Sequence, residues 1–103
     1  MKVSNRIIID STAERVWKIL AIDFDKADLW MASVPKSYEK LEGQRADGAN
    51  MVGRICEFTN KQDGPYADET ITKMDHVNRE MQLRVVPQNG KIPVAQNIAT
   101  INV

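Results

Sequence analysis

The chain opens with an alternation of polar and apolar residues that is typical of an extended segment. Val3, Ile7 and Ile9 fall on one side of such a segment over Lys2–Ile9. The run of three isoleucines at its end favours a strand, because branching at Cβ restricts the rotamers that are available in a helix. We therefore predict that Lys2–Ile9 forms the first strand.

A helical pattern follows directly. Ser11 and Glu14 lie three residues apart, as in a capping box, where each side chain satisfies a free backbone N–H at a helix start. A helix is therefore predicted to begin near Thr12, and a second, short helix is predicted around Ala27–Met31, before Pro35. Apolar residues recur at helical spacing in the first helix and predict a face that packs on a sheet: Ala13, Val16, Trp17, Ile19 and Leu20.

From Ser37 onward the apolar period changes to two, with turn residues between short runs, which is typical of antiparallel strands joined in order. The strongest turn signals are Asp63-Gly64 and Asn89-Gly90, because these residues tolerate positive φ. Five strands are predicted, near Ser37–Glu42, Gly53–Asn60, Tyr66–Met74, Glu80–Val86 and Ala95–Val103. The pattern predicts one α+β domain over residues 1–103, a curved antiparallel sheet with an N-terminal helical segment.

Composition narrows the class of protein. With 14 basic and 14 acidic residues, the chain has no net charge that would attract nucleic acid. Cys56 is the only cysteine, so an internal disulfide or a multi-cysteine metal site is excluded, and a cytoplasmic location is expected. Asp23, Asp25 and Asp28 do not match the spacing of a calcium loop. No signal peptide, membrane span, metal or cofactor is expected.

Residues at particular spacings connect these elements to a known family. The strand Ile7–Ile9 runs into Ser11–Trp17, which ends in a Val-Trp pair, and Trp30 follows an acidic loop. The later positions are a glycine-flanked hairpin with a following arginine and a glutamate strand that ends in aspartate: Gly48, Gly53, Arg54, Gly64, Glu69 and Asp75. Over essentially the whole chain this pattern resembles the START-like (SRPBCC) superfamily of polyketide cyclases and lipid-transport proteins. The resemblance implies a helix-grip fold, with a cavity between sheet and helix.

The chain departs from that family at its end. Members usually continue through a further strand into a long C-terminal helix that closes the cavity, whereas this sequence stops at Val103. Two interpretations stay open. Either the domain is a C-terminally short version of the fold, or a partner, such as a second copy in a homodimer, covers the exposed sheet face.

A pocket for a lipid-like ligand needs apolar walls and a few polar groups that orient the ligand. Apolar side chains on shared strand faces could line such a pocket or simply fill a core. Arg54 and Glu69 could form a surface pair, which is the default interpretation, or orient a polar head group. Trp30 could cap the mouth of the pocket. The candidate ligand-binding residues are Trp30, Arg54, Cys56, Phe58, Glu69, Met81, Leu83, Val85 and Ile101.

Three functions follow from these observations. The leading hypothesis is binding or transport of a small hydrophobic ligand, either a lipid or a polyketide-like molecule. The second is a cofactor-independent polyketide cyclase or dehydratase, in which Glu69, Arg54 or Tyr66 would move protons or stabilise an enolate. The third is a dimeric or regulatory interaction module. His76, the only histidine, is predicted to lie in an exposed turn, and Trp17 in the core.

Overall fold

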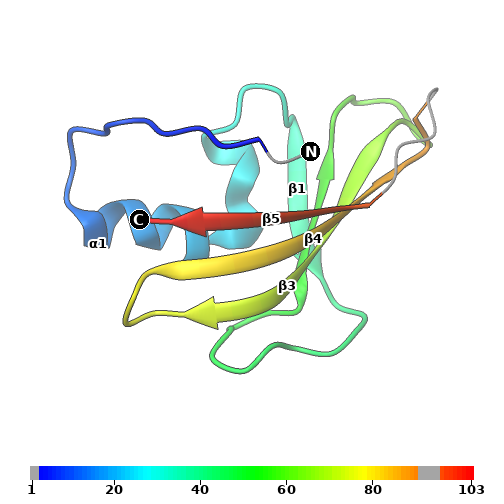
Figure 1. The fold of residues 1–103 in the computed structure, drawn as a ribbon. Helices are drawn as coiled ribbons and strands as arrows, with labels where there is room; N and C mark the ends of the chain where they lie inside the picture. The colour runs from blue at the N-terminus through cyan, green and yellow to red at the C-terminus, as the bar shows by residue number, and fades with distance from the viewer. Residues whose placement is uncertain (1–2, 91–95) are drawn as a thin grey trace.

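One antiparallel sheet of five strands forms the body of the protein, and the helices pack on one of its faces (Figure 1). The computed structural model describes residues 3–90 and 96–103. The strands lie side by side in chain order, and each pairs antiparallel with the next. They are β1 (Lys36–Lys40), β2 (Gly53–Glu57), β3 (Tyr66–Asp75), β4 (Glu80–Gln88) and β5 (Asn97–Asn102). The predicted α+β class with an antiparallel sheet is therefore confirmed.

The strand boundaries differ modestly from the predicted ones. β4 continues two residues beyond Val86, to Gln88. The last strand begins at Asn97, and Ala95, where it was predicted to begin, lies outside the described residues. Asp63 and Asn89 adopt positive φ angles of 59° and 54°. Both turn signals thus mark positions where the backbone enters the left-handed region.

Three short helical segments precede the sheet: α1 (Ala13–Trp17), the π-helical η1 (Lys18–Ile22) and the 3-10 helix η2 (Phe24–Leu29). The cap residue is Thr12 rather than Ser11, because the Thr12 hydroxyl accepts a hydrogen bond of 3.2 Å from the Arg15 N–H. The predicted second helix, Ala27–Met31, begins earlier, at Phe24. Its displaced start brings Phe24 onto the sheet.

The predicted first strand is wrong. In its described part, residues 3–9, the chain forms no strand, and Ile7 and Ile8 are 77% and 96% exposed. Figure 1 shows this segment running outside the sheet. Isoleucine-rich sequence has high strand propensity, but a strand forms only where a neighbouring strand supplies hydrogen-bond partners. No described strand pairs with this segment.

We call the sheet side that packs against the helices the inner face, and the opposite side the outer face. The inner face carries Arg54, Cys56, Ala67, Glu69, Ile71, Met81, Leu83, Val85, Ala99 and Ile101. The outer face carries Lys36, Tyr38, Lys40, Glu57, Tyr66, Asp68, Arg84, Ile98 and Thr100. The two sets alternate along each strand, as the pleat requires.

Two apolar clusters make the core on the inner face. In the larger cluster, Trp17 and Phe24 pack with Ile71, Met81 and Leu83, together with Met74 and the β1–β2 loop. The smaller cluster consists of Ala27, Val34, Cys56 and Ala67. Full burial of a side chain such as Met81 contributes about 1.5–3 kcal/mol, so the larger cluster holds α1 and η2 on the sheet.

A bulge in β3 allows Ile71 and Met74 to share this core. The two residues are three apart, so in a regular strand they would point to opposite faces. The register between β3 and β4 shifts between Ile71 and Lys73, which returns Met74 to the inner face opposite Met81. The bulge therefore keeps both Ile71 and Met74 in the same buried cluster.

His76 connects three separate parts of the chain. Its Nδ1 accepts a hydrogen bond of 3.0 Å from the indole N–H of Trp17, and its Nε2 lies 2.8 Å from the carbonyl oxygen of Gly48. Because Nδ1 accepts, the proton lies on Nε2, which donates to Gly48. The side chain is exposed in its turn, as predicted, but it also fixes α1 and the β1–β2 loop at one end of the sheet.

The turn between β3 and β4 is closed by Asp75. Its Oδ1 accepts hydrogen bonds of 3.1 Å from the Val77 N–H and 3.0 Å from the Asn78 N–H. These bonds, those of Asn78 first, lower the pKa of the Asp75 carboxyl below its ordinary value of 3.8. The turn predicted over Asp75–Asn78 is therefore present, and the ionised carboxylate stabilises it.

We expect Asp75→Asn to reduce the loss of stability in acid. A pKa that is lowered in the folded state means that the unfolded chain binds more protons in acid, so stability is present above the ordinary value of 3.8 and is lost as the pH falls through the folded value. Asparagine keeps the acceptor oxygen but does not titrate. Urea unfolding at a series of pH values measures the difference, and an unchanged acid dependence would contradict this role.

Candidate functional site

A buried ion pair lies on the inner face at the centre of the sheet. Arg54 on β2 and Glu69 on β3 are direct cross-strand partners and are 4% and 8% exposed. The Arg54 Nε and Nη2 atoms donate to the Glu69 Oε1 atom at 3.2 and 3.0 Å, and Nη1 donates to the Phe24 carbonyl oxygen at 2.9 Å. The default interpretation as a surface pair is wrong, because both side chains are buried and Phe24 of η2 packs on the Arg54 guanidinium.

The sequence around Arg54 makes this arrangement possible. A Cβ at the preceding residue, Gly53, would collide with the carbonyl oxygen of Glu69, so β2 and β3 approach closely only because this position is glycine. The Arg54 guanidinium also lies 3.9 Å from the centre of the Phe24 ring, within the range of a cation–π contact. The pair thus joins two strands to η2.

The bonds of the pair offset a large desolvation cost. Each charge taken out of water costs several kcal/mol, and only well-placed hydrogen bonds restore that energy. Among the described residues, every buried side-chain nitrogen and oxygen atom has a hydrogen-bond partner. Both Arg54 bonds end on Glu69 Oε1, which leaves Oε2 free of Arg54. This oxygen is a polar group on the inner face that a ligand could engage.

Cys56 lies two residues beyond Arg54 on the inner face and is 1% exposed. Burial raises the pKa of its thiol to about 12; the charge of Arg54 lowers it, and that of Glu69 raises it again. The thiol is therefore protonated at neutral pH and does not act as a nucleophile. Within residues 3–90 and 96–103, no three His, Cys, Asp or Glu side chains are grouped so that they could hold a metal ion.

A strip of partly buried apolar side chains borders the ion pair. Val85 on β4 is the cross-strand partner of Glu69. Farther along the same face of the sheet, Ala99 on β5 lies opposite Leu83, and Ile101 lies opposite Met81. All three pack against the core while remaining partly exposed. We call Val85, Ala99 and Ile101 the apolar strip. Its Val85 end adjoins the side chain of Glu69, and the strip runs from there along the inner face to Ile101.

The structure divides the other predicted ligand-binding residues into two groups. Cys56, Met81 and Leu83 are at most 2% exposed and belong to the core. Phe58 and Trp30 are 43% and 44% exposed. Trp30 lines a small hollow of about 210 Å³ among residues of η1 and η2, apart from the apolar strip. With Arg54, Glu69, Val85 and Ile101 at the ion pair and the apolar strip, the predicted ligand-binding residues thus occupy three different environments.

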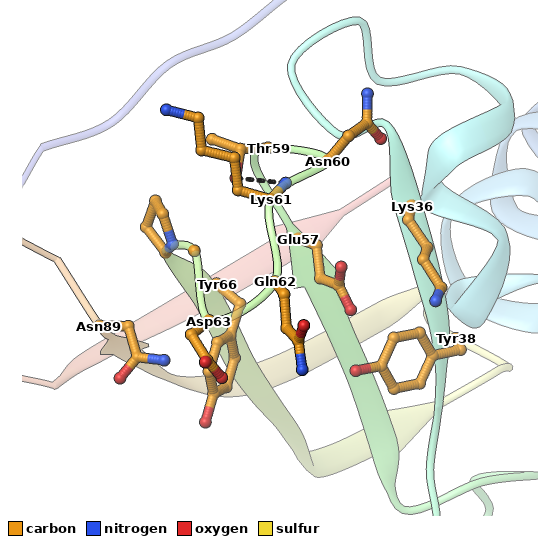
Figure 2. A pocket seen from close by; sticks show the side chains of 12 residues that line it. Lys36, Tyr38, Glu57, Thr59, Asn60, Lys61, Gln62, Asp63, Tyr66 and Asn89 are labelled. Atoms are coloured by element: carbon orange, nitrogen blue, oxygen red, sulfur yellow. Dashed lines mark hydrogen bonds between the residues drawn. The ribbon is translucent and has the colours of Figure 1, made fainter.

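A larger hollow of about 560 Å³ lies on the outer face (Figure 2). Its floor is a row of cross-strand partners, Lys36 on β1, Glu57 on β2 and Tyr66 on β3, with Tyr38 beside them. The loop between β2 and β3 forms one wall, through Thr59, Asn60, Lys61, Gln62, Asp63, Gly64 and Pro65, and Asn89 follows β4. We call this site the outer hollow.

Polar contacts within the outer hollow centre on Tyr38. Its hydroxyl and the side chains of Glu57 and Gln62 point toward one another (Figure 2). Partial burial, and then the hydrogen bond and charge of Glu57, raise the pKa of the Tyr38 phenol. The Lys36 ammonium lies 5.4 Å from the centre of the Tyr38 ring. The hollow therefore presents charged, amide and phenol groups rather than apolar walls.

The three candidate catalytic residues do not meet. Tyr66 lies in the outer hollow, whereas Arg54 and Glu69 lie on the inner face. Tyr66 and Glu69 are three residues apart on β3, and this odd spacing places them on opposite sides of the sheet. The outer hollow was not predicted from the sequence, although the alternation of Lys36 and Tyr38 with inward residues on β1 is a signal for it.

We expect Arg54→Met alone to destabilise the protein by about 3–5 kcal/mol, because it leaves the Glu69 carboxylate buried without its partner. The double variant Arg54→Met/Glu69→Leu removes both charges and should recover most of that loss. Urea unfolding measures both free energies. Lys40→Met is the matched control: it removes a 2.7 Å ion pair with Asp68 on the outer face, at side-chain exposures of 21% and 29%, and should cost less than about 1 kcal/mol.

Cys56 should react with a thiol reagent only when the protein unfolds. At pH 8 its pKa of about 12 keeps the thiol protonated, and burial at 1% exposure excludes the reagent. Labelling by 5,5′-dithiobis(2-nitrobenzoate) should therefore be slow in buffer and fast in concentrated urea. Equal labelling rates in both conditions would show that η2 does not cover the thiol in solution.

In the part of the chain that the structure describes, no helix has the length and apolar character needed to cross a membrane. Comparison of the chain with family models, curated proteins and solved structures gave no match.

Proposed function

We propose that this chain is a ligand-binding domain of the START-like, helix-grip kind, which holds a small apolar molecule with one polar group against the inner face. The antiparallel sheet with its helices on one face supports this proposal. Arg54 and Glu69 also support it, because they are two of the residues on which the resemblance to the START-like family rests and they lie on the inner face. The ligand would be of the lipid or polyketide class.

The observation that carries the proposal is the junction of the apolar strip with Glu69. Val85 and Glu69 are cross-strand partners, and Oε2 of Glu69 is not used by Arg54. Ligand sites commonly combine apolar walls with a few polar groups that fix orientation. A ligand hydroxyl could donate to Oε2 while its apolar part extends from Val85 over Ala99 towards Ile101. Covering about 200 Å² of apolar surface would contribute about 5 kcal/mol before the entropic cost of binding.

In this proposal the remaining candidates have different roles. Cys56, Met81 and Leu83 form the packed floor beneath the ligand and do not touch it, since they are at most 2% exposed. Trp30 and Phe58 are accessible at the surface and are available to extend the apolar contact. The free, buried Cys56 agrees with a reducing compartment such as the cytoplasm.

Binding is favoured over catalysis by the geometry of the charged groups. A general acid or base needs to reach the reacting proton within about 3 Å. Arg54 and Glu69 are engaged with each other, and Tyr66 is on the other side of the sheet. The cyclase or dehydratase alternative would therefore have to rely on Glu69 alone, and no described observation favours it.

We expect the uncharged fluorophore N-phenyl-1-naphthylamine to bind the apolar strip with increased emission. Ile101→Gln places an amide in the strip and should weaken this binding roughly tenfold, which corresponds to about 1.4 kcal/mol. Ile98→Gln is the matched control, because Ile98 lies on the outer face of the same strand and is 64% exposed. Fluorescence titration of the three proteins measures the affinities. Equal affinities, or no emission change with the unmodified protein, would contradict the proposal.

Light scattering of the same samples tests the interaction-module alternative. A second copy that covered the apolar strip would exclude the fluorophore and double the molecular mass. A monomer that binds the fluorophore supports the ligand proposal, whereas a dimer that binds none, and that Ile101→Gln separates, supports the interaction module.

A further inference from the structure

We infer that the outer hollow binds a neutral polyhydroxylated molecule, that is, a sugar of one or two rings. This site is on the opposite side of the sheet from the apolar strip, so it goes beyond the function proposed above. Its volume of about 560 Å³ lies within the range of about 300–1,000 Å³ that is typical of small-molecule sites. The chemistry of its lining decides the class of ligand.

The charges in the outer hollow balance. Lys36 and Lys61 are matched by Glu57 and Asp63, so the lining carries as many positive as negative side chains. A strongly charged ligand, such as a phosphate ester or a polyamine, would meet an opposing charge wherever it met an attractive one. The balance therefore favours a ligand without net charge.

The polar groups exclude an apolar ligand from the same place. Each donor or acceptor that such a ligand covered without pairing would lose its hydrogen bonds to water and gain none in return. The lining includes three carboxamides, Asn60, Gln62 and Asn89, each of which offers both donors and acceptors. Hydroxyl groups also donate and accept. A molecule with several hydroxyls can therefore satisfy a lining of this kind without leaving many groups unpaired.

Two phenol rings complete the match with a sugar. Tyr38 and Tyr66 each combine a flat apolar face with a polar hydroxyl; Tyr66 is the cross-strand partner of Glu57, and Tyr38 lies on β1, two residues beyond Lys36, the other partner of Glu57. A sugar ring has the same mixture, since its C–H groups form apolar patches and its hydroxyls form polar edges. Figure 2 shows the two rings on either side of the Glu57 and Gln62 side chains.

The loop that walls the hollow is held in place before any ligand arrives. The Phe58 N–H donates to the Pro65 carbonyl oxygen at 3.1 Å, and the Gly64 N–H donates to the Lys61 carbonyl oxygen at 3.2 Å. The Lys61 N–H donates to the Thr59 hydroxyl at 3.3 Å, drawn as the dashed line in Figure 2. A Cβ at Gly64 would collide with the same hydroxyl. Such preorganisation lowers the entropic cost of binding.

The test is a titration followed by ¹H–¹⁵N correlation spectra of the full chain. Glucose, galactose, maltose, cellobiose and lactose are added separately at millimolar concentrations, and inorganic phosphate is the charged comparison. We expect at least one sugar to shift the backbone amides of β1 and of the β2–β3 loop, with no such shift from phosphate. No shift from any of the five sugars, or the same shifts from phosphate, would overturn the inference.

Variants locate the binding in the outer hollow. Glu57→Gln keeps the shape of the side chain but removes its charge, and Gln62→Ala removes a carboxamide from the exposed loop; each should weaken sugar binding at least fivefold. Thr100→Ala is the matched control, because Thr100 is exposed on the outer face of β5, away from the hollow. Unchanged sugar affinity in both hollow variants would overturn the inference. Naphthylamine binding to Glu57→Gln should stay unchanged, which separates this site from the apolar strip.

Discussion

The buried contact of Arg54 with Glu69 constrains everything that packs on the inner face. Two charges have been taken from water, and the compensation comes from each other, from the Phe24 carbonyl oxygen and from the Phe24 ring. The segment η2, which packs on β1 and β2, must therefore stay in place, since its departure would leave the Arg54 guanidinium without one of its acceptors. The pair also lies between the two apolar clusters. Phe24, which contacts Arg54, belongs to the larger cluster, and Cys56, two residues after Arg54 on β2, belongs to the smaller one.

The pleat of β3 gives the domain two chemically independent surfaces. Glu69 faces the helices beside apolar side chains, while Tyr66 faces the opposite way among charged and amide groups. One surface suits a molecule that is mostly hydrocarbon, and the other suits a molecule that is mostly hydroxyl. Because the surfaces share strands but no side chains, a change in one site leaves the chemistry of the other intact.

Local features of the sequence predicted the strands of the sheet well, but they predicted poorly which other segments pair with the sheet or pack on it. The period-two pattern and the residues Asp63 and Asn89 identified all five strands, because alternation and positive φ are properties of short segments. The isoleucine run failed as a strand, since pairing depends on a distant segment. The burial of Arg54 could not be predicted either, because only the tertiary position of η2 removes it from water. The outer hollow could not be predicted either, because it forms only when β1, β2, β3 and the β2–β3 loop come together in the folded chain.

The two edge strands of the sheet differ in how strongly they oppose pairing with a strand of another molecule. β1 is short and carries Lys36, Glu39 and Lys40, whose charges oppose the addition of another strand. β5, over Asn97–Asn102, contains no charged residue and carries the exposed Ile98, and no described strand pairs with its outer side. In concentrated solutions we therefore expect aggregation to begin by strand pairing at β5. A single lysine introduced on this strand would oppose that pairing.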